Sequence, residues 1–272
     1  MVVVDYDELQ SNRHLSIATN PSSVTIGVFD GIHRGHVKLL HTAFADDMHQ
    51  KVVVTFRDNP KAILYPDSFG GCILTLNQKL EHLKSYGVDV VVLIDFSTDF
   101  STLQGTEFMT YLAGNLTIAR LVVGSNFRCG AGARFTADRI RDFFASTNME
   151  ILIVDQLKHE NGLRVSSSYI RECIRAGDME TAAHLLDREH AIDLSDIDCK
   201  NDIGQFTIDA TEIGQLLPPP GVYLVSVQDD REVISGSMEH DGSKLSVKLE
   251  HAIDTSCSLF SELRIEKRVS LL

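Results

Sequence analysis

The sequence has no apolar run near the ~20 residues needed to cross a bilayer; residues 90–94 are typical of its longest. Its first five residues carry no basic group, so we expect no secretory signal peptide. Basic charge is also scarce, since 25 Lys and Arg stand against 38 Asp and Glu, a formal net charge of −13. An acidic surface repels nucleic acid and anionic membranes, so we expect neither as a partner. A local basic pocket for phosphates remains compatible with this charge.

Cysteines are few and scattered. There are five, an odd number, and no two have the spacing of metal ligands: Cys72, Cys129, Cys173, Cys199 and Cys257. We therefore expect free thiols in a reducing cytoplasm, and we assign no protein residue as a metal ligand. Hydrophobic residues at 43% and charged residues at 23% are ordinary for a globular chain, and 272 residues suffice for one large domain or two modest ones.

Short apolar runs alternate with helical patterns from residue 24 to about residue 186. The strand candidates are rich in Val and Ile and apolar on both faces, as buried parallel strands are. They are residues 24–29, 52–56, 88–94, 121–123 and 151–154, with helices expected at 37–49, 78–86, 106–112 and 137–146. This alternation predicts an α/β domain with a parallel sheet, whose ligands sit beyond the carboxyl ends of the strands.

The sequence changes character after residue 187. Three prolines, Pro218 to Pro220, precede an apolar run at 222–227, and strand-like stretches follow at 245–249 and 263–269. Short strands separated by turn residues predict a small antiparallel sheet or barrel-like domain. We place the boundary near Ile192, which gives domains of residues 1–191 and 192–272.

Residues 27–36 read Gly-Val-Phe-Asp-Gly-Ile-His-Arg-Gly-His and join a predicted buried strand to a predicted helix. Glycines let the backbone turn tightly and approach a ligand closely. The N-terminus of the helix offers N–H groups and a positive dipole end to a phosphate. His33 and His36 lie three residues apart at this point, so both imidazoles can face one anion. The segment therefore predicts a phosphate site.

His33-x-Gly35-His36 resembles the HxGH signature of the nucleotidyltransferase superfamily, and the longer string resembles the prokaryotic FAD synthetase family. Three later segments resemble that family in the same order, so the resemblance covers about residues 20–190. They are residues 54–60, with Asn59 for the usual His, residues 122–130, and residues 164–171, with Ser168 for the usual Thr. The family fold is a Rossmann-like adenylyltransferase domain followed by a β-barrel riboflavin kinase domain.

The resemblance implies an FMN adenylyltransferase, which transfers AMP from ATP to FMN and uses Mg²⁺. It implies that His33, His36 and Arg171 are catalytic. The residues implied for nucleotide binding are Gly27, Phe29, Asp30, Gly31, Gly35, Asn126, Arg164, Ser167 and Ser168. Those implied for flavin binding are Phe56, Asn59, Pro60 and Phe127.

The second domain matches the family's kinase domain poorly. The string Gly-[Phe/Tyr]-Pro-Thr-Ala-Asn, which serves the metal-nucleotide in the family, does not occur after residue 187. Only residues 219–223 resemble the strand that follows it. We interpret this domain as a reduced or degenerate relative of the kinase, without riboflavin kinase activity.

Two other functions fit the same residues. A nucleotidyltransferase with another phosphate acceptor would use His33, His36 and Arg171 equally well. A flavin- or nucleotide-binding protein without turnover would form a second class, although the intact HxGH string argues against it. The sequence leaves the oligomeric state open.

Overall fold

The computed structural model describes residues 1–10, 15–46, 48–160, 162–197, 200–202, 204–228, 233–250 and 260–270. The chain forms two compact units. Unit 1 comprises Met1–Phe69 and Lys79–Arg164, and unit 2 comprises Gly70–Gln78 and Val165–Leu272. The domain boundary that we predict near Ile192 is a position along the sequence, whereas these units are defined by contacts in space. The boundary stays a prediction.

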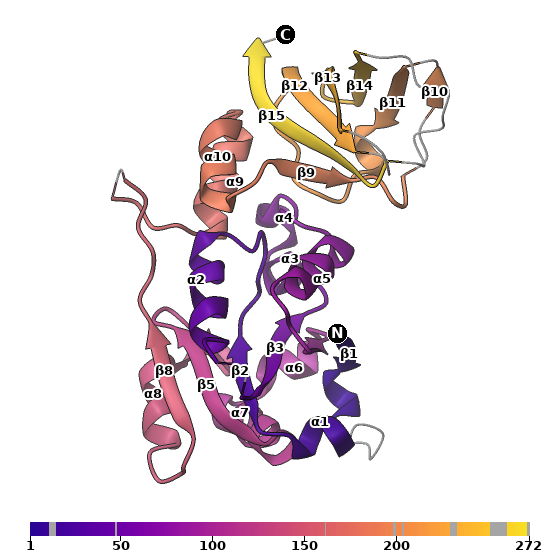
Figure 1. Ribbon diagram of the computed structural model, residues 1–272. Coiled ribbons are helices and arrows are strands. Elements are labelled where there is room, and N and C mark those ends of the chain that lie inside the picture. The colour runs from indigo at the N-terminus through magenta and orange to yellow at the C-terminus, as the bar shows by residue number, and fades with distance from the viewer. Residues whose placement is uncertain are drawn as a thin grey trace. The chain divides into compact units, whose positions relative to one another are not determined.

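Unit 1 is built on a six-stranded parallel sheet in the order β1-β4-β3-β2-β5-β8 (Figure 1). Every residue of β2 and β4 is buried, as expected where both faces of a parallel sheet are covered. The strands are β1 (Val2–Asp5), β2 (Ser22–Ile26), β3 (Gln50–Phe56), β4 (Val90–Ile94), β5 (Ile118–Gly124) and β8 (Glu150–Val154). The expected α/β fold class is confirmed.

The helices of unit 1 connect these strands. They are η1 (Tyr6–Glu8), α1 (Leu15–Thr19), α2 (Arg34–Ala43), α3 (Pro60–Leu64), α4 (Pro66–Phe69), α6 (Thr98–Thr102), α7 (Gly105–Asn115), η3 (Ala131–Ala133) and α8 (Ala137–Phe143). A short hairpin of β6 (Arg128–Cys129) and β7 (Phe135–Thr136) follows β5. Helix α5 (Leu76–Ser85) contains the boundary between the two units.

Two of our sequence-based bounds are wrong for a local reason. The strand predicted at 24–29 ends at Ile26, because the backbone turns into a positive-φ loop at Phe29. The helix predicted from residue 37 begins at Arg34, because the His33 side chain caps it. We also missed β1, which pairs in parallel with β4.

The strand order reverses beside β2. The chain passes from β2 to β3 to β4 in one direction across the sheet, then continues with β5 and β8 on the other side of β2. Open parallel sheets bind ligands beyond the carboxyl ends of the strands at such a reversal. Residues 27–36 follow β2, residues 57–60 follow β3 and residues 125–127 follow β5, so three motif segments share one edge of the sheet.

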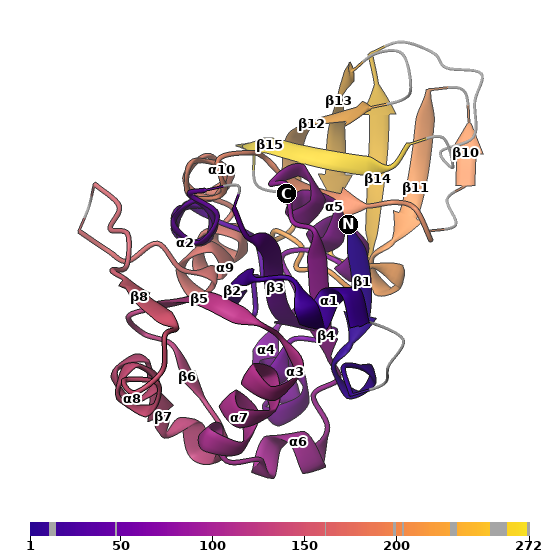
Figure 2. The same cartoon turned by 60° about the horizontal axis from the view of Figure 1, so that its bottom comes forward.

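Unit 2 contains a seven-stranded antiparallel sheet in the order β10-β11-β14-β13-β12-β15-β9, a half-barrel in which β13, β14 and β11 lie side by side (Figure 2). The strands are β9 (His190–Asp193), β10 (Lys200–Asp202), β11 (Gln205–Asp209), β12 (Gly221–Gln228), β13 (Val233–His240), β14 (Lys244–Leu249) and β15 (Glu262–Ser270). Its helices are α9 (Ser167–Ala176), α10 (Met179–Leu186) and η4 (Ala210–Glu212). The expected second, β-rich domain is thus confirmed as a fold.

No helix in the described parts of the chain is long and apolar enough to span a bilayer. Within the same residues Cys72, Cys129 and Cys173 form no disulfide, whereas Cys199 and Cys257 lie outside the described residues.

Candidate functional site

The loop between β2 and α2 has an unusual backbone. Phe29, Gly31 and Ile32 have φ angles of 52°, 87° and 37°. Glycine adopts such angles readily, but for Phe29 and Ile32 they cost about 1–3 kcal/mol each. Both side chains are almost fully buried, at 0% and 1% exposure, so core packing holds the loop in this shape. Gly27 contributes by lacking a side chain, since a Cβ there would lie 3.1 Å from the Phe29 ring.

The two histidines of the loop stack on each other. The ring centroids of His33 and His36 are 3.7 Å apart, with 14° between the ring planes. Nδ1 of His33 accepts the backbone N–H of His36 at 3.3 Å, which caps α2. A nitrogen that accepts carries no proton, so the neutral His33 ring carries its proton on Nε2. The Phe29 ring lies 5.1 Å from that of His36 and supports the pair from the core.

The surroundings of His36 disfavour its protonated form. Its pKa is lowered well below the ordinary value, first by burial and second by neighbouring His33. Its Nδ1 is buried and has no hydrogen-bond partner within the described residues. A bound anion would reverse the shift, because a nearby negative charge favours the protonated ring. Bound phosphate would therefore favour the protonated form of His36.

Asn59 connects the end of β3 to this loop. Its Nδ2 donates to the Asp30 carboxylate at 3.2 Å, and its Oδ1 accepts the Lys61 N–H at 3.1 Å, which caps α3. Asn59 and Asp30 are both buried, at 8% and 6% exposure. The residue that departs from the family pattern thus holds the loop and starts the helix at Pro60. Its predicted contact with flavin stays a prediction.

Charged side chains fix the carboxyl end of β3. Lys79, which is buried, donates from Nζ to the Phe56 carbonyl at 2.6 Å. Arg57 forms ion pairs with Asp95, at 2.7 Å, and with Asp5. These pairs raise the pKa of Arg57, the hydrogen bond to Asp95 being the largest cause. Arg57 therefore ties neighbouring strands together.

The segment after β5 contains two residues of the predicted site, exposed Asn126 and half-buried Phe127. Asn126 is exposed, and a Cβ on Gly124 would lie 3.0 Å from its Oδ1, so the glycine leaves room for the amide. Phe127 donates its N–H to the Gly124 carbonyl at 2.9 Å. Phe127 and Phe56 both pack partly against the core of unit 1. Their partial burial is compatible with core packing and with a ligand.

The serine motif forms the start of α9 in unit 2. Ser166 is the cap, and its hydroxyl accepts the Tyr169 N–H at 3.2 Å. Ser167 and Ser168 are the first two residues of the helix, half-buried and exposed respectively. We named Ser167 and Ser168 from the motif but missed the capping role of Ser166, which Ser followed by an apolar helix pattern could have indicated.

Arg171 and Arg164 have different surroundings. Arg171 is 6% exposed, and its Nε donates to the Gly71 carbonyl at 3.1 Å, a partner 100 residues away that the motif did not indicate. Arg164 is exposed and belongs to unit 1, where it forms a β-bridge with Lys158.

The structure brings part of the predicted site together. Within unit 1 Phe56 is the last residue of β3. The loop of residues 27–36, Asn59 and Asn126 follow strands that end at the same edge of the sheet. Ser167, Ser168 and Arg171 belong to unit 2, so their part in the same reaction stays a prediction.

In the described part of the chain, no group of three or more His, Cys, Asp and Glu side chains could hold a metal ion. Protein ligands alone therefore form no Mg²⁺ site among these residues. Asp30, the carboxylate of the loop, accepts from Asn59. Mg²⁺ commonly takes few protein ligands and completes its shell with substrate phosphates and water.

A sequence model of the FAD synthetase family matches residues 16–169, more than half of the chain. The chain belongs to the FAD synthetase family. The matched region contains the loop of residues 27–36 with its stacked histidines, Asn59 and the start of α9.

Similar curated proteins carry related names. A bifunctional riboflavin kinase/FMN adenylyltransferase from Buchnera aphidicola (Schizaphis graminum) is 27% identical over 66% of this chain, which spans 59% of that protein's length. An FAD synthetase from Listeria monocytogenes is 30% identical over 64% of the chain and 73% of its own length. The bifunctional riboflavin kinase/FMN adenylyltransferase of Escherichia coli K12 is 30% identical over 75% of the chain and 67% of its own length.

A solved structure shares the whole architecture. A macrolide-efflux protein from Streptococcus pneumoniae matches with a TM-score of 0.81 at 24% identity, covering 100% of this chain and 92% of that one. At this level of identity the match shows a common fold.

Proposed function

We propose that the chain transfers the AMP unit of ATP to FMN, giving FAD and pyrophosphate. An oxygen of the FMN phosphate forms a bond to the α-phosphorus of ATP, and the bond from that phosphorus to the oxygen of the leaving pyrophosphate breaks. The attacking group is already an anion near neutral pH, so the reaction needs no general base. It needs alignment, and positive charge where negative charge accumulates.

The observation that supports this proposal is the stacked pair of His33 and His36 at the start of α2. The helix N-terminus offers backbone N–H groups, and His33 adds a donor at Nε2. His36 adds an imidazole that stacks on His33 and whose buried Nδ1 has no hydrogen-bond partner among the described residues. Pre-organised donors of this kind stabilise the charge of a phosphoryl transition state and of a leaving pyrophosphate.

The remaining predicted residues have roles within this proposal. Arg171 would fork onto phosphate oxygens, since a guanidinium can hold two of them. Ser167, Ser168, Asn126 and Arg164 would serve the nucleotide, and Phe56, Asn59, Pro60 and Phe127 would line the flavin pocket. A flat aromatic ligand favours such apolar and aromatic walls. Mg²⁺ would shield the β- and γ-phosphates.

The test is to incubate purified protein with FMN, ATP and Mg²⁺ and to separate the flavins by chromatography. FAD is the expected product. Unreacted FMN that stays tightly bound would support a binding protein without turnover. Protein that binds no flavin would support a transferase with another phosphate acceptor.

Riboflavin offered in place of FMN is expected to remain unchanged. Transfer of a γ-phosphate needs a nucleotide loop that approaches closely and a firmly held Mg²⁺. The glycines after Ile192 are scattered, and the family's Pro-Thr-Ala-Asn string is missing. The measurement uses protein freed of bound flavin, with riboflavin, ATP and Mg²⁺. FMN or FAD above a no-protein control would show that unit 2 is a working kinase.

Replacing Arg171 by Lys is expected to lower kcat/KM for ATP about tenfold, the size of one charge-assisted hydrogen bond. An ammonium is a point charge and cannot both bond the Gly71 carbonyl as Nε does and fork onto phosphate. Arg139→Lys, on an exposed arginine of helix α8 in unit 1, is the control. A kcat/KM unchanged within about threefold would remove Arg171 from the phosphate site.

A further inference from the structure

Residues 70–78, which we call the strap, lie far in sequence from the rest of unit 2 but belong to it. The strap runs against the segment before β12. The Leu216 N–H donates to the Cys72 carbonyl at 2.8 Å, and Cys72 forms a parallel β-bridge with Gln215. Gly71 has a φ of 102°, and a Cβ there would lie 2.9 Å from the Leu216 nitrogen. The two backbones therefore touch where Gly71 has no side chain.

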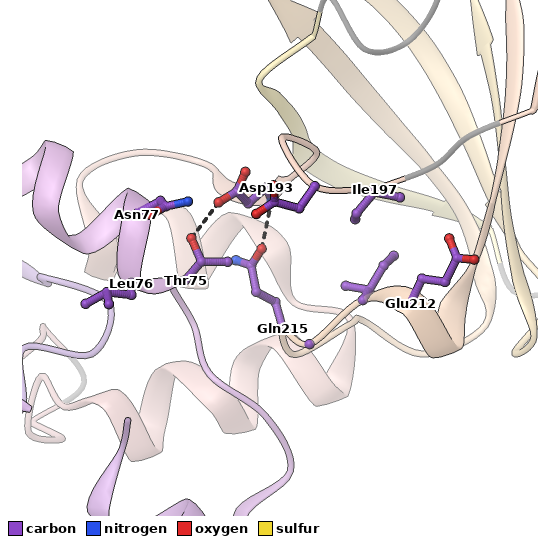
Figure 3. A pocket seen from close by; sticks show the side chains of 10 residues that line it. Thr75, Leu76, Asn77, Asp193, Ile197, Glu212 and Gln215 are labelled. Atoms are coloured by element: carbon purple, nitrogen blue, oxygen red, sulfur yellow. Dashed lines mark hydrogen bonds between the residues drawn. The ribbon is translucent and has the colours of Figure 1, made fainter. Parts of the chain in front are cut away.

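Gln215 is the centre of a buried polar network beside this contact. It is 6% exposed, and its Nε2 lies 3.0 Å from each of three acceptors, the Ile73 carbonyl, the Gln78 side chain and the Ala191 carbonyl. Its Oε1 accepts the Asp193 N–H at 2.7 Å (Figure 3). One side chain thus joins both halves of the strap to strand β9.

The strap adds its own side chains to the network. The Thr75 hydroxyl donates to the Asp193 carboxylate at 2.6 Å (Figure 3). Gln78 donates to Glu262 on β15 at 2.9 Å and to the Ala191 carbonyl at 3.2 Å. A pocket of about 210 Å³ borders these groups. A buried network of this kind is rigid when satisfied and costly when one member is lost, so it holds the strap in one position.

Arg171 is attached to the strap. Its Nε donates to the Gly71 carbonyl at 3.1 Å, and this bond sets the direction of the planar guanidinium. The two residues after Gly71 have their carbonyls bonded by Leu216 and by Gln215. The position of the Gly71 carbonyl, and with it the orientation of Arg171, therefore depends on Gln215.

We propose that Gln215 is a positioning residue for the nucleotide phosphates, because it holds the strap that orients Arg171. The antiparallel sheet of unit 2 then contributes to adenylyl transfer by holding Arg171 in position, although unit 2 lacks the Pro-Thr-Ala-Asn string of the family's kinase domain. The inference rests on the proposed function for the contact between Arg171 and the phosphates of ATP.

The first test is Gln215→Met, which removes the amide and keeps the length of the side chain. ATP affinity is measured by calorimetry without flavin, and FAD synthesis by steady-state kinetics. We expect ATP affinity and kcat/KM for ATP to fall about tenfold, within the range for coupled buried groups, with KM for FMN within about twofold. Gln205→Met, on an exposed glutamine of β11, is the matched control and should change neither. A Gln215→Met protein that behaves like wild type overturns the proposal.

The second test is a double-mutant cycle with Arg171→Ala. If Gln215 acts through Arg171, then Gln215→Met changes ATP affinity by less than about twofold once the arginine is gone. A merely structural role predicts the same loss in both backgrounds, so additive losses overturn the proposal. Should Gln215→Met fail to fold, Thr75→Val removes the outer bond to Asp193 together with the bond that the Thr75 hydroxyl accepts from the Gln78 N–H, and leaves Gln215 in place. It should lower ATP affinity about threefold with Arg171 present and not without it; additive or absent effects overturn the proposal.

The binding measurement separates this inference from the proposed function. Wild-type protein that binds ATP but makes no FAD overturns FMN adenylylation, whereas the ATP affinities of the variants still decide the role of Gln215. Wild-type protein that binds no ATP overturns both.

Discussion

Replacing His36 by Ala is expected to slow FAD synthesis ~10²-fold or more while the protein still folds. A donor aimed at developing transition-state charge is worth about 10²–10³ in rate. His36 occupies the first turn of α2, stacks on His33 at 3.7 Å between ring centroids, and keeps a buried Nδ1 without a partner among the described residues. The measurement is kcat at saturating FMN and ATP.

The control for this variant is His41→Ala on the same helix, where the side chain is exposed. Circular dichroism of both variants checks that α2 and its sheet still form. His41→Ala should keep wild-type turnover. A folded His36→Ala protein with near-normal turnover would contradict the assignment of the HxGH pair to catalysis.

Acidification is expected to destabilise unit 2 through His190. This side chain is 1% exposed, and its Nε2 donates to the Leu216 carbonyl at 2.8 Å. Burial, the largest cause, lowers its pKa from 6.5 to about 4; Arg188 lowers it further and the bond to Leu216 opposes the shift. Between these values the unfolded chain binds a proton that the folded chain does not. The free energy of unfolding is therefore unaffected by His190 above pH 6.5 and has fallen by about 3 kcal/mol at pH 4.

Urea unfolding at pH 7 and pH 4 of wild type and of His190→Gln measures this contribution. Glutamine can donate to the same carbonyl and does not titrate, so the variant should lose about 3 kcal/mol less than wild type over that interval. Exposed His184, changed to Gln, serves as the matched control and should leave the difference between the two pH values unaltered. Equal pH dependence in wild type and His190→Gln would contradict a buried neutral His190.

Much of the fold was predictable because burial leaves a pattern in the sequence. Strands β3 and β4 are apolar on both faces, and the predicted 52–56 and 88–94 overlap them closely. Strand β1 escaped because four residues near the N-terminus carry little periodicity of their own. Strand β13 escaped because its apolar residues Val233, Ile234 and Met238 do not alternate regularly with polar ones, and its pairing with β12 and β14 was needed to define it.

The candidate site was predictable to the extent that it is local. His33 and His36 are three residues apart on one helix start, so their proximity follows from the chain itself. The roles of Asn59 and Arg57 were not predictable, because their partners Asp30, Asp5 and Asp95 come from separate strands or loops. The resemblance to the family marked Asn59 as unusual without indicating what it contacts.

The sequence by itself determined the parallel sheet, the helix after the glycine-rich loop and membership in the FAD synthetase family, because each depends on residues close together along the chain. Only the tertiary structure decided that residues 70–78 belong to unit 2. The same holds for the hydrogen bonds from Arg171 to the Gly71 carbonyl and from Gln215 to the Ile73 carbonyl. Hydrogen bonds between segments 100 or more residues apart produce no spacing or periodicity in the sequence. The packing of the folded chain determines which groups meet, and the neighbours of each residue in sequence do not.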